Sequence, residues 1–194
     1  MYDLPTALVI DGKSVPITNK GDFRMILDCF EALNDVDLTE EERIISALLI
    51  FYDDLNDVEE LYTLTDIEER LNAMFNFFNC GQKEAGKQVD YKLVDWKDDE
   101  MLIISAVNKV AGQEIRALDY VHWYTFMGWY FGIGRSALQT VVGIRDKIVH
   151  GKKLDDFEKE YRQSNPEYFN WDRRTLKQAE EEKLIMSIWN QDKQ

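Results

Sequence analysis

The chain has 194 residues, of which 45% are hydrophobic and 12% aromatic, so it can bury a core and is too apolar to be mainly disordered. Its formal charge of −14 argues against binding to nucleic acid phosphates or anionic membranes, because both need a basic surface. Three prolines and ten glycines leave few interruptions, which favours helices. We predict a mainly α-helical protein, a helical bundle with a short N-terminal β-hairpin, in a single domain over residues 1–194.

The sequence predicts a protein of the cell interior. Cys29 and Cys80 do not form a CxxC pair, and two isolated thiols are typical of reduced, structural cysteines. Residues 1–20 lack the basic start and apolar run of a signal peptide. A run of eighteen apolar residues, the mark of a membrane-spanning helix, does not occur. We therefore expect the protein in the cytoplasm, with no membrane association.

Residues 1–20 are predicted to form the hairpin. Apolar and polar residues alternate on both sides of Asp11-Gly12, a dipeptide typical of a two-residue turn. Pro16 is tolerated only in an edge strand, so the hairpin would be an appendage of the fold. An extended arm is the alternative.

The rest of the first half carries helical patterns. Apolar residues at steps of three and four predict one helix from about residue 21 and another in the stretch ERIISALLIFYDD, residues 42–54. Thr39 opens a capping box in front of the second helix. Asp57 and Asp66 are placed to start the next two helical segments, the later of which ends near Gly81.

Residues 81–92 (GQKEAGKQVDYK) are polar, contain two glycines and lack periodicity, which predicts an internal linker. A helix follows, capped by Asp95 or Asp98 and stopped by Gly112. Its apolar residues in register at the helical period are Met101, Ile104, Val107 and Val110. After a break at Asn165-Pro166, the pattern predicts a charged amphipathic C-terminal helix over residues 170–194.

Residues 119–134 (DYVHWYTFMGWYFGIG) contain a dense group of aromatic side chains. A membrane anchor would need basic flanks and base stacking would need several Arg and Lys, and neither is present. A helix that is apolar on nearly every side is typical of a core. Gly128 and Gly132 would let a neighbouring backbone approach this helix closely. The spacing places five residues on one face: Trp123, Phe126, Met127, Tyr130 and Phe131.

We predict no catalytic, metal-binding or cofactor-binding residue. His122 and His150 have no further His or Cys at zinc-ligand spacing, and the acidic clusters lack the glycine of a calcium loop. Acids at helix starts complement the helix dipole instead. We expect His122 to be structural and His150 to end a helix. A hydrolase that uses His122 with Asp119 is an open alternative.

Several short motifs in fixed order resemble a known family. In residues 94–147 they are DWKDDEMLIISAVNKV, VHWYTF and VVGIRDKI. In the first half they are a hairpin, a helix opening at DFR, an apolar helix with LLIFY and a segment closing in FFNCG. Over residues 6–165 the chain thus resembles the bacteriophage gene-product-fifteen family of siphophage tail-morphogenesis proteins. The residues that we take as its core signature are His122, Trp123, Phe126, Tyr130 and Arg145.

The resemblance implies a non-enzymatic role, because the family pattern supplies no catalytic residue and no cofactor. Such proteins resemble tail-assembly chaperones, which are encoded beside the tape-measure protein and coat that long helical protein until tail-tube subunits polymerise around it. A protein of this kind would work in the host cytoplasm and bind phage tail proteins, with homo-oligomers an open question. The alternative function is an acidic DNA mimic or another phage-encoded inhibitor of a host protein.

The predicted C-terminal helix lies outside the family pattern. A late amphipathic helix docks either onto its own domain or onto another chain. We predict partner-binding residues in this helix and at the edge of the aromatic stretch: Trp129, Leu176, Ile185, Ile188 and Trp189.

Overall fold

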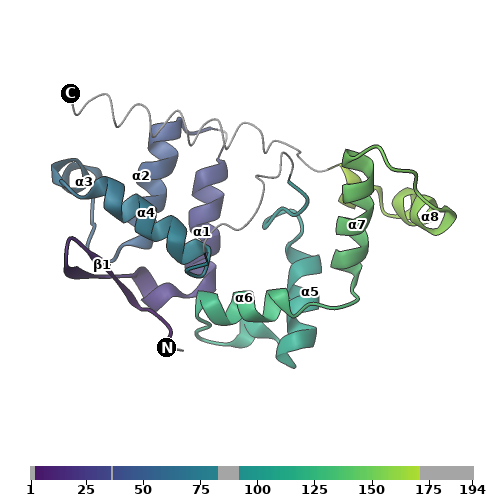
Figure 1. Ribbon diagram of the computed structural model, residues 1–194, viewed down its shortest axis with the longest axis horizontal. Coiled ribbons are helices and arrows are strands. Elements are labelled where there is room, and N and C mark those ends of the chain that lie inside the picture. Colours follow the sequence, from purple (N-terminus) through teal and green to yellow (C-terminus); the bar gives the residue numbers. More distant parts are fainter. Residues whose placement is uncertain (1–2, 36, 83–91, 171–194) are drawn as a thin grey trace. The chain divides into compact units, whose positions relative to one another are not determined.

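The computed structural model describes residues 3–35, 37–82 and 92–170 (Figure 1). Its contacts divide the chain into two compact units, residues 1–86 with 116–128 and residues 87–115 with 129–194. Among the described residues there are eight α-helices and one two-stranded antiparallel sheet near the N-terminus. The predicted fold class, mainly α with a short N-terminal hairpin, is therefore confirmed, while the single domain stays a prediction.

The hairpin of the first unit consists of β1 (Ala7–Ile10) and β2 (Lys13–Pro16). Asp11 and Gly12 both have positive φ, 48° and 71°, which is the backbone of the turn that the Asp-Gly dipeptide predicts. The pairing of β1 with β2 confirms the hairpin over the extended arm. A backbone hydrogen bond from Asp53 to the carbonyl of Pro16 joins the hairpin to the helical part of the unit.

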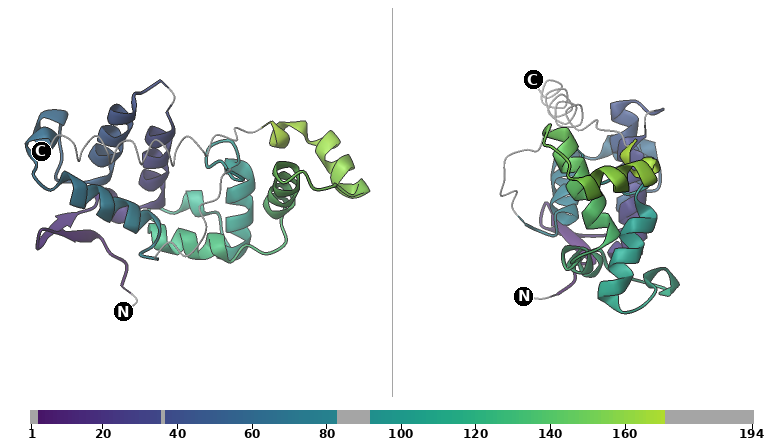
Figure 2. Two further views of the ribbon diagram at one scale, coloured as in Figure 1. Left: turned by 45° about the horizontal axis from the view of Figure 1, so that its top comes forward. Right: turned by 90° about the vertical axis from the view of Figure 1, so that its right-hand side faces the viewer.

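Two helices run side by side in the first unit, α1 (Phe23–Asn34) and α2 (Glu40–Phe51) (Figures 1 and 2). A short 3-10 turn, η1 (Thr18–Gly21), leads from the hairpin into α1. The Thr39 hydroxyl accepts the backbone N–H of Glu42, and the Glu42 carboxylate accepts the N–H of Thr39. The capping box predicted from the sequence is thus confirmed.

The first half ends with α3 (Val58–Thr63) and α4 (Ile67–Phe78). The Asp57 carboxylate accepts the N–H of Glu60 and caps α3 as predicted. Asp66 precedes α4 as predicted, but its side chain forms no capping hydrogen bond. It binds Arg70 one turn later instead, and Arg70 also forms a bidentate ion pair with Asp54. The Asp66 carboxylate thus binds the guanidinium of Arg70 and not the backbone N–H groups of α4.

The second unit contains α5 (Glu100–Ala111), η2 (Ile115–Ala117) at its edge, α7 (Ala137–Val149), α8 (Asp156–Ser164) and η3 (Pro166–Phe169). Helix α6 (Trp123–Phe131) begins in the first unit and ends in the second. Gly112 ends α5 with φ of 72°, as the sequence predicts. The N-cap of α5 is Asp99, so the prediction of Asp95 or Asp98 is wrong.

The buried side of α5 also differs from the predicted stripe. Ile104 and Val107 are buried, but Met101 is 66% exposed and Val110 is 39% exposed. The side chains that replace them in the core are Leu102, Ile103 and Ala106. A helix with nearly continuous apolar residues offers several stripes, and contact with α7 selects one of them.

Two predicted segments lie wholly or mostly outside the described residues. They are the linker over residues 81–92, described only at its ends, and the C-terminal helix over residues 170–194, described only at its first residue. Within the described part of the chain, no helix combines the length and the apolar character that crossing a bilayer requires.

Candidate functional site

The first cluster of signature residues joins the start of α1 to the start of α6. Asp22, the N-cap of α1, accepts the backbone N–H of Arg24 and the backbone N–H of Val121. The N–H of Phe23 donates to the carbonyl of Val121 at 2.9 Å, and Asp22 and His122 form an isolated β-bridge. The DFR and VHW motifs, far apart in the sequence, are therefore in direct contact.

The His122 side chain is buried and takes part in this junction. Its Nδ1 lies 3.0 Å from the backbone nitrogen of Tyr124, and its Nε2 lies 3.0 Å from the carbonyl oxygen of Pro5. A backbone N–H can only donate, so Nδ1 accepts and the ring proton resides on Nε2. Burial lowers the pKa of His122 below its ordinary value, which favours this neutral ring. Both ring nitrogens are thus engaged in fixing the backbone.

Close packing explains why glycine precedes this junction. Gly21 has φ of 76°, and a Cβ added there would lie 2.8 Å from Cζ of Phe77 and 3.4 Å from Nε2 of His122. A larger residue would be strained both by its backbone conformation and by the Phe77 ring. The contact holds the FFNCG motif against the histidine.

Trp123 and Phe126 form the aromatic centre of the first unit. Phe126 stacks on Phe23 with ring centroids 4.6 Å apart, and Trp123 stacks on Phe126 at 5.6 Å. The indole N–H of Trp123 donates to the carbonyl of Phe78 at 2.9 Å, which satisfies its polar atom inside the core. Trp123 and Phe126 are 1% and 0% exposed, so these two signature residues belong to the core.

The predicted buried face of α6 is wrong at Phe131. Tyr130, four residues after Phe126, is half-buried, and Phe131, four residues after the buried Met127, is 64% exposed. Tyr130 instead lies beside Trp96, with ring centroids 5.2 Å apart. A Cβ added at Gly128 would meet no other side chain or distant backbone among the described residues within 4 Å, so the close approach predicted there does not occur. The buried side chains of α6 are Trp123, Phe126 and Met127, in its first turns.

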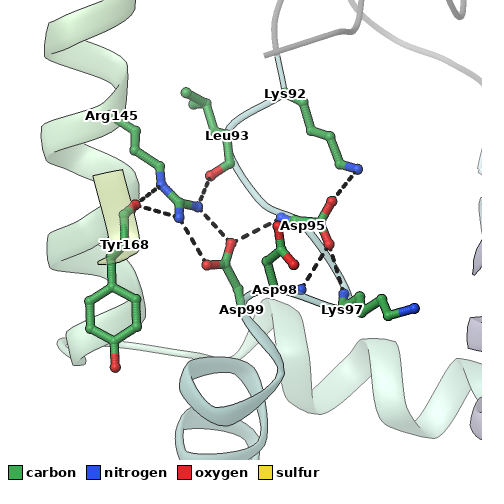
Figure 3. A network of polar contacts seen from close by, with 8 residues as sticks. All are labelled: Lys92, Leu93, Asp95, Lys97, Asp98, Asp99, Arg145 and Tyr168. Carbon is green, nitrogen blue, oxygen red and sulfur yellow. Dashed lines mark hydrogen bonds and ion pairs between the residues drawn. The ribbon is translucent and has the colours of Figure 1, made fainter. Parts of the chain in front are cut away.

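The second cluster is a buried ion pair between Asp99 and Arg145 (Figure 3). Both side chains are 1% exposed, and the two carboxylate oxygens accept from the guanidinium at 2.6 and 2.9 Å. The guanidinium also donates to the carbonyl of Leu93 and twice to the carbonyl of Tyr168. These five hydrogen bonds match the five N–H groups of an arginine. One side chain thus ties α7 to the start of α5, to residue 93 and to η3.

A turn in front of α5 positions Asp99 for this pair. The Asp95 carboxylate accepts the backbone N–H groups of Lys97 and Asp98, and Lys92 binds its other oxygen (Figure 3). The N–H of Asp95 in turn donates to Oδ2 of Asp99 at 2.9 Å. Asp99 was missed by the sequence analysis because three aspartates stand within five residues. The apolar spacing of α5, with Asp99 next to its first turn, is the only local signal that distinguishes it.

The contacts of His122 differ from those that a hydrolase using His122 with Asp119 would require. The acid that neighbours His122 in the structure is Asp22 at the β-bridge, in place of the Asp119 that the hydrolase hypothesis requires. His150 follows α7 directly, as predicted, and its Nδ1 lies 2.9 Å from the carbonyl of Asp146. Within the described part of the chain, no three His, Cys, Asp or Glu side chains are grouped so that they could hold a metal ion.

Apolar side chains at the surface of the second unit are the candidates for partner contact. Trp129, which we predicted to bind a partner, is half-buried in α6. Larger exposed fractions occur at Phe131, Met101 and Phe157, which are each 64 to 66% exposed. The other predicted partner-binding residues lie outside the described part of the chain: Leu176, Ile185, Ile188 and Trp189.

The comparison with known protein families agrees with the two clusters. The family model described as Bacteriophage Gp15 protein matches residues 1–169, which include both clusters and end one residue after Tyr168. Searches of curated proteins and of solved structures gave no match. The match spans most of the chain and confirms the resemblance drawn from the motifs. The chain belongs to the Bacteriophage Gp15 protein family.

Proposed function

We propose that the protein is a non-enzymatic tail-assembly chaperone that binds the tape-measure protein of its phage in the host cytoplasm. The observation that carries this proposal is the family match over residues 1–169. A chaperone of a long helical protein needs a soluble surface and apolar side chains that can cover a partner helix. The formal charge of −14 and the exposed Met101, Phe131 and Phe157 supply these properties.

The ionisable side chains of both clusters support a binding role over catalysis. His122, Asp22, Asp99 and Arg145 are buried and hydrogen-bonded to the protein's own backbone or to each other. A general base must reach a proton on a substrate, and these groups are oriented inward. The acids of α2, α3 and α8 stand in first helical turns, where they stabilise the helix dipole. Helix capping explains these acids without a DNA mimic.

The test is co-expression with the tape-measure protein encoded by the same phage. We expect the full chain to keep the tape-measure protein soluble and to co-purify with it, whereas tape-measure protein expressed alone aggregates. Replacing Phe131 by Ser should weaken co-purification, because Phe131 is exposed in the second unit. The matched control is Tyr62→Ser, an exposed aromatic residue of α3 in the first unit.

Three results would contradict the proposal. The first is an insoluble tape-measure protein in the presence of the full chain. The second is a soluble tape-measure protein that does not co-purify. The third is capture of a host DNA-binding protein in place of tail proteins, which would favour the inhibitor alternative. Unchanged binding in both single variants would place the contact surface elsewhere without removing the chaperone role.

A further inference from the structure

Helix α8 (Asp156–Ser164) is poorly covered by the other described residues. Its nine residues include no buried side chain. Isolated helices shorter than about 12 residues are marginal in water, and helices of folded proteins gain most of their stability by packing an apolar side. The capping box of Asp155 with Glu158 and the ion pair of Lys147 with Glu158 fix the start of α8 through polar groups. Further burial of its apolar side would therefore stabilise this helix.

The apolar side of α8 is aromatic, and we define Phe157, Tyr161 and Phe169 as the α8 aromatic face. The ring centroids of Phe157 and Tyr161 are 5.9 Å apart, and those of Tyr161 and Phe169 are 6.4 Å apart. Phe157 is 64% exposed, and the other two residues are half-buried. Three neighbouring rings in contact with water form a surface that a partner's apolar side chains would stabilise by covering it.

Two exposed carboxylates border the α8 aromatic face, and we define Glu160 and Glu167 as its acidic rim. Glu160 stands three residues after Phe157, a spacing that makes the two neighbours on the surface of a helix. Burial, Tyr168 and the Glu167 carboxylate together raise the pKa of Tyr161, so Glu167 lies close to the Tyr161 ring. The rings and the negative charge therefore belong to one surface.

The basic residues of the same segment do not neutralise this rim. Residues 155–169 contain five acids and two bases, Lys159 and Arg162. These bases follow Phe157 by two and five residues, spacings that place them on other sides of the helix. Lys159 is also paired with Asp156. The aromatic face is thus bordered by net negative charge.

This combination of rings and carboxylates narrows the class of partner. A second copy of the chain would bring the same acidic rim and another formal charge of −14, and like charges oppose such a contact. Nucleic acids and anionic membranes are opposed for the same reason. Lys and Arg side chains fit the surface, because their apolar stems pack on rings and their charged ends reach carboxylates. An amphipathic helix with apolar and basic residues presents both kinds of group on one side.

We propose that the α8 aromatic face and its acidic rim bind a basic amphipathic helix of another protein. The apolar side chains of that helix would cover Phe157 and Tyr161, and its Lys or Arg side chains would pair with Glu160 and Glu167. The inference rests on this surface alone and does not depend on the tail-assembly role. Apolar burial supplies affinity in this contact, and the charges select basic helices over acidic ones.

Binding of two synthetic peptides to the full-length protein tests the proposal. Each peptide is an amphipathic helix of about eighteen residues with leucine on one side, and the other side carries lysine in the first peptide and glutamate in the second. Fluorescence anisotropy at low ionic strength, where exposed charges are least screened, measures the affinity. We expect the protein to bind the lysine peptide and not the glutamate peptide.

Variants of the protein locate the contact. Phe157→Ser should weaken binding of the lysine peptide about tenfold, because it removes the most exposed ring of the face. Glu160→Gln should weaken it about two- to fivefold, as expected for one exposed ion pair. The matched controls are Tyr62→Ser and Glu59→Gln, which change an exposed ring and an exposed acid of α3 in the first unit. Circular dichroism reports whether each variant is folded.

Weaker binding in both α8 variants, with both controls like the wild type, would support the proposal. Wild-type affinity in both α8 variants would overturn it, because the overall negative charge would then explain the binding. Equal affinity for the two peptides would overturn the selection of basic helices. A dimer in light scattering that Phe157→Ser dissociates would also overturn it, because the occupant would be a second copy. Co-purification with the tape-measure protein is measured separately, so this inference and the proposed function fail independently.

Discussion

Asp22 and Val121 lie 99 positions apart in the sequence, and the carboxylate of the first accepts the backbone N–H of the second at 2.8 Å. The same carboxylate caps α1 through the N–H of Arg24. The Asp22 side chain therefore caps α1 and also binds the backbone of Val121, which leads into α6. Asp22 thus has two structural roles in the first unit.

Replacing Asp22 by Ala should lower the free energy of unfolding by about 2 to 4 kcal/mol. Loss of an N-cap costs about 1 kcal/mol, and a buried N–H left without its acceptor, here that of Val121, costs about 1 to 3 kcal/mol. Denaturant unfolding followed by circular dichroism measures the change. Asp28→Ala on the same helix is the control, because Asp28 is exposed and should shift the value by less than about 0.5 kcal/mol. Equal effects of the two substitutions would contradict the double role.

Removing one partner of the Asp99–Arg145 pair should be strongly destabilising. A buried charge left alone typically costs about 3 to 5 kcal/mol, so Arg145→Met and Asp99→Leu should each lose that much. The double variant should lose clearly less than the sum, because it leaves neither charge unpaired. The control is Lys152→Met, which breaks the surface pair with Asp146 and should cost about 1 kcal/mol or less. Additive losses in the double variant would show that the pair is not coupled.

Two phenylalanines of α6 should respond differently to truncation. Phe126→Ala should cost about 3 to 5 kcal/mol, because its ring is fully buried against Phe23 and Trp123. Phe131→Ala, five residues later on the same helix, should cost less than about 1 kcal/mol because its ring is 64% exposed. Thermal unfolding of the two variants makes the comparison. A melting temperature that Phe126→Ala leaves unchanged would remove Phe126 from the core.

His122 should make the protein less stable in acid. Its pKa is lowered in the folded state by burial, so the unfolded chain binds a proton at a higher pH than the folded chain does. The stability from the neutral ring is complete above the unfolded pKa of about 6.5 and is lost as the pH falls below it. Unfolding free energies at pH 7.5 and pH 5.5 should differ more in the wild type than in His122→Gln.

His150→Gln is the matched control for this pH effect, because the His150 ring is exposed at the end of α7. We expect it to leave the wild-type pH dependence in place, whereas an equal reduction by both variants would contradict the assignment to His122. His122→Gln should also co-purify with tape-measure protein to within a few-fold of the wild type. A loss of about 10²-fold or more of a biological activity in the folded variant would instead favour a catalytic histidine.

The sequence by itself determined the features that depend on neighbouring residues. The Asp11-Gly12 turn, the Thr39 capping box and the Gly112 helix end all follow from backbone hydrogen bonds and φ angles over a few residues. Local chemistry therefore sufficed to predict a mainly helical chain with an N-terminal hairpin. The ordered motifs also sufficed to place the chain in its family.

Only the tertiary structure decided which side of each apolar helix is buried and which charged residues meet. Helix α6 is apolar on nearly every side, so its periodicity does not show that the side of Phe126 is buried and the side of Phe131 exposed. The sequence did not show which of the neighbouring aspartates is buried, and the structure shows that Asp99 pairs with Arg145, 46 positions later. A buried charge is stable only beside a partner, and the partner's position depends on how distant helices pack. That packing is a property of the whole unit, and no short stretch of sequence contains it.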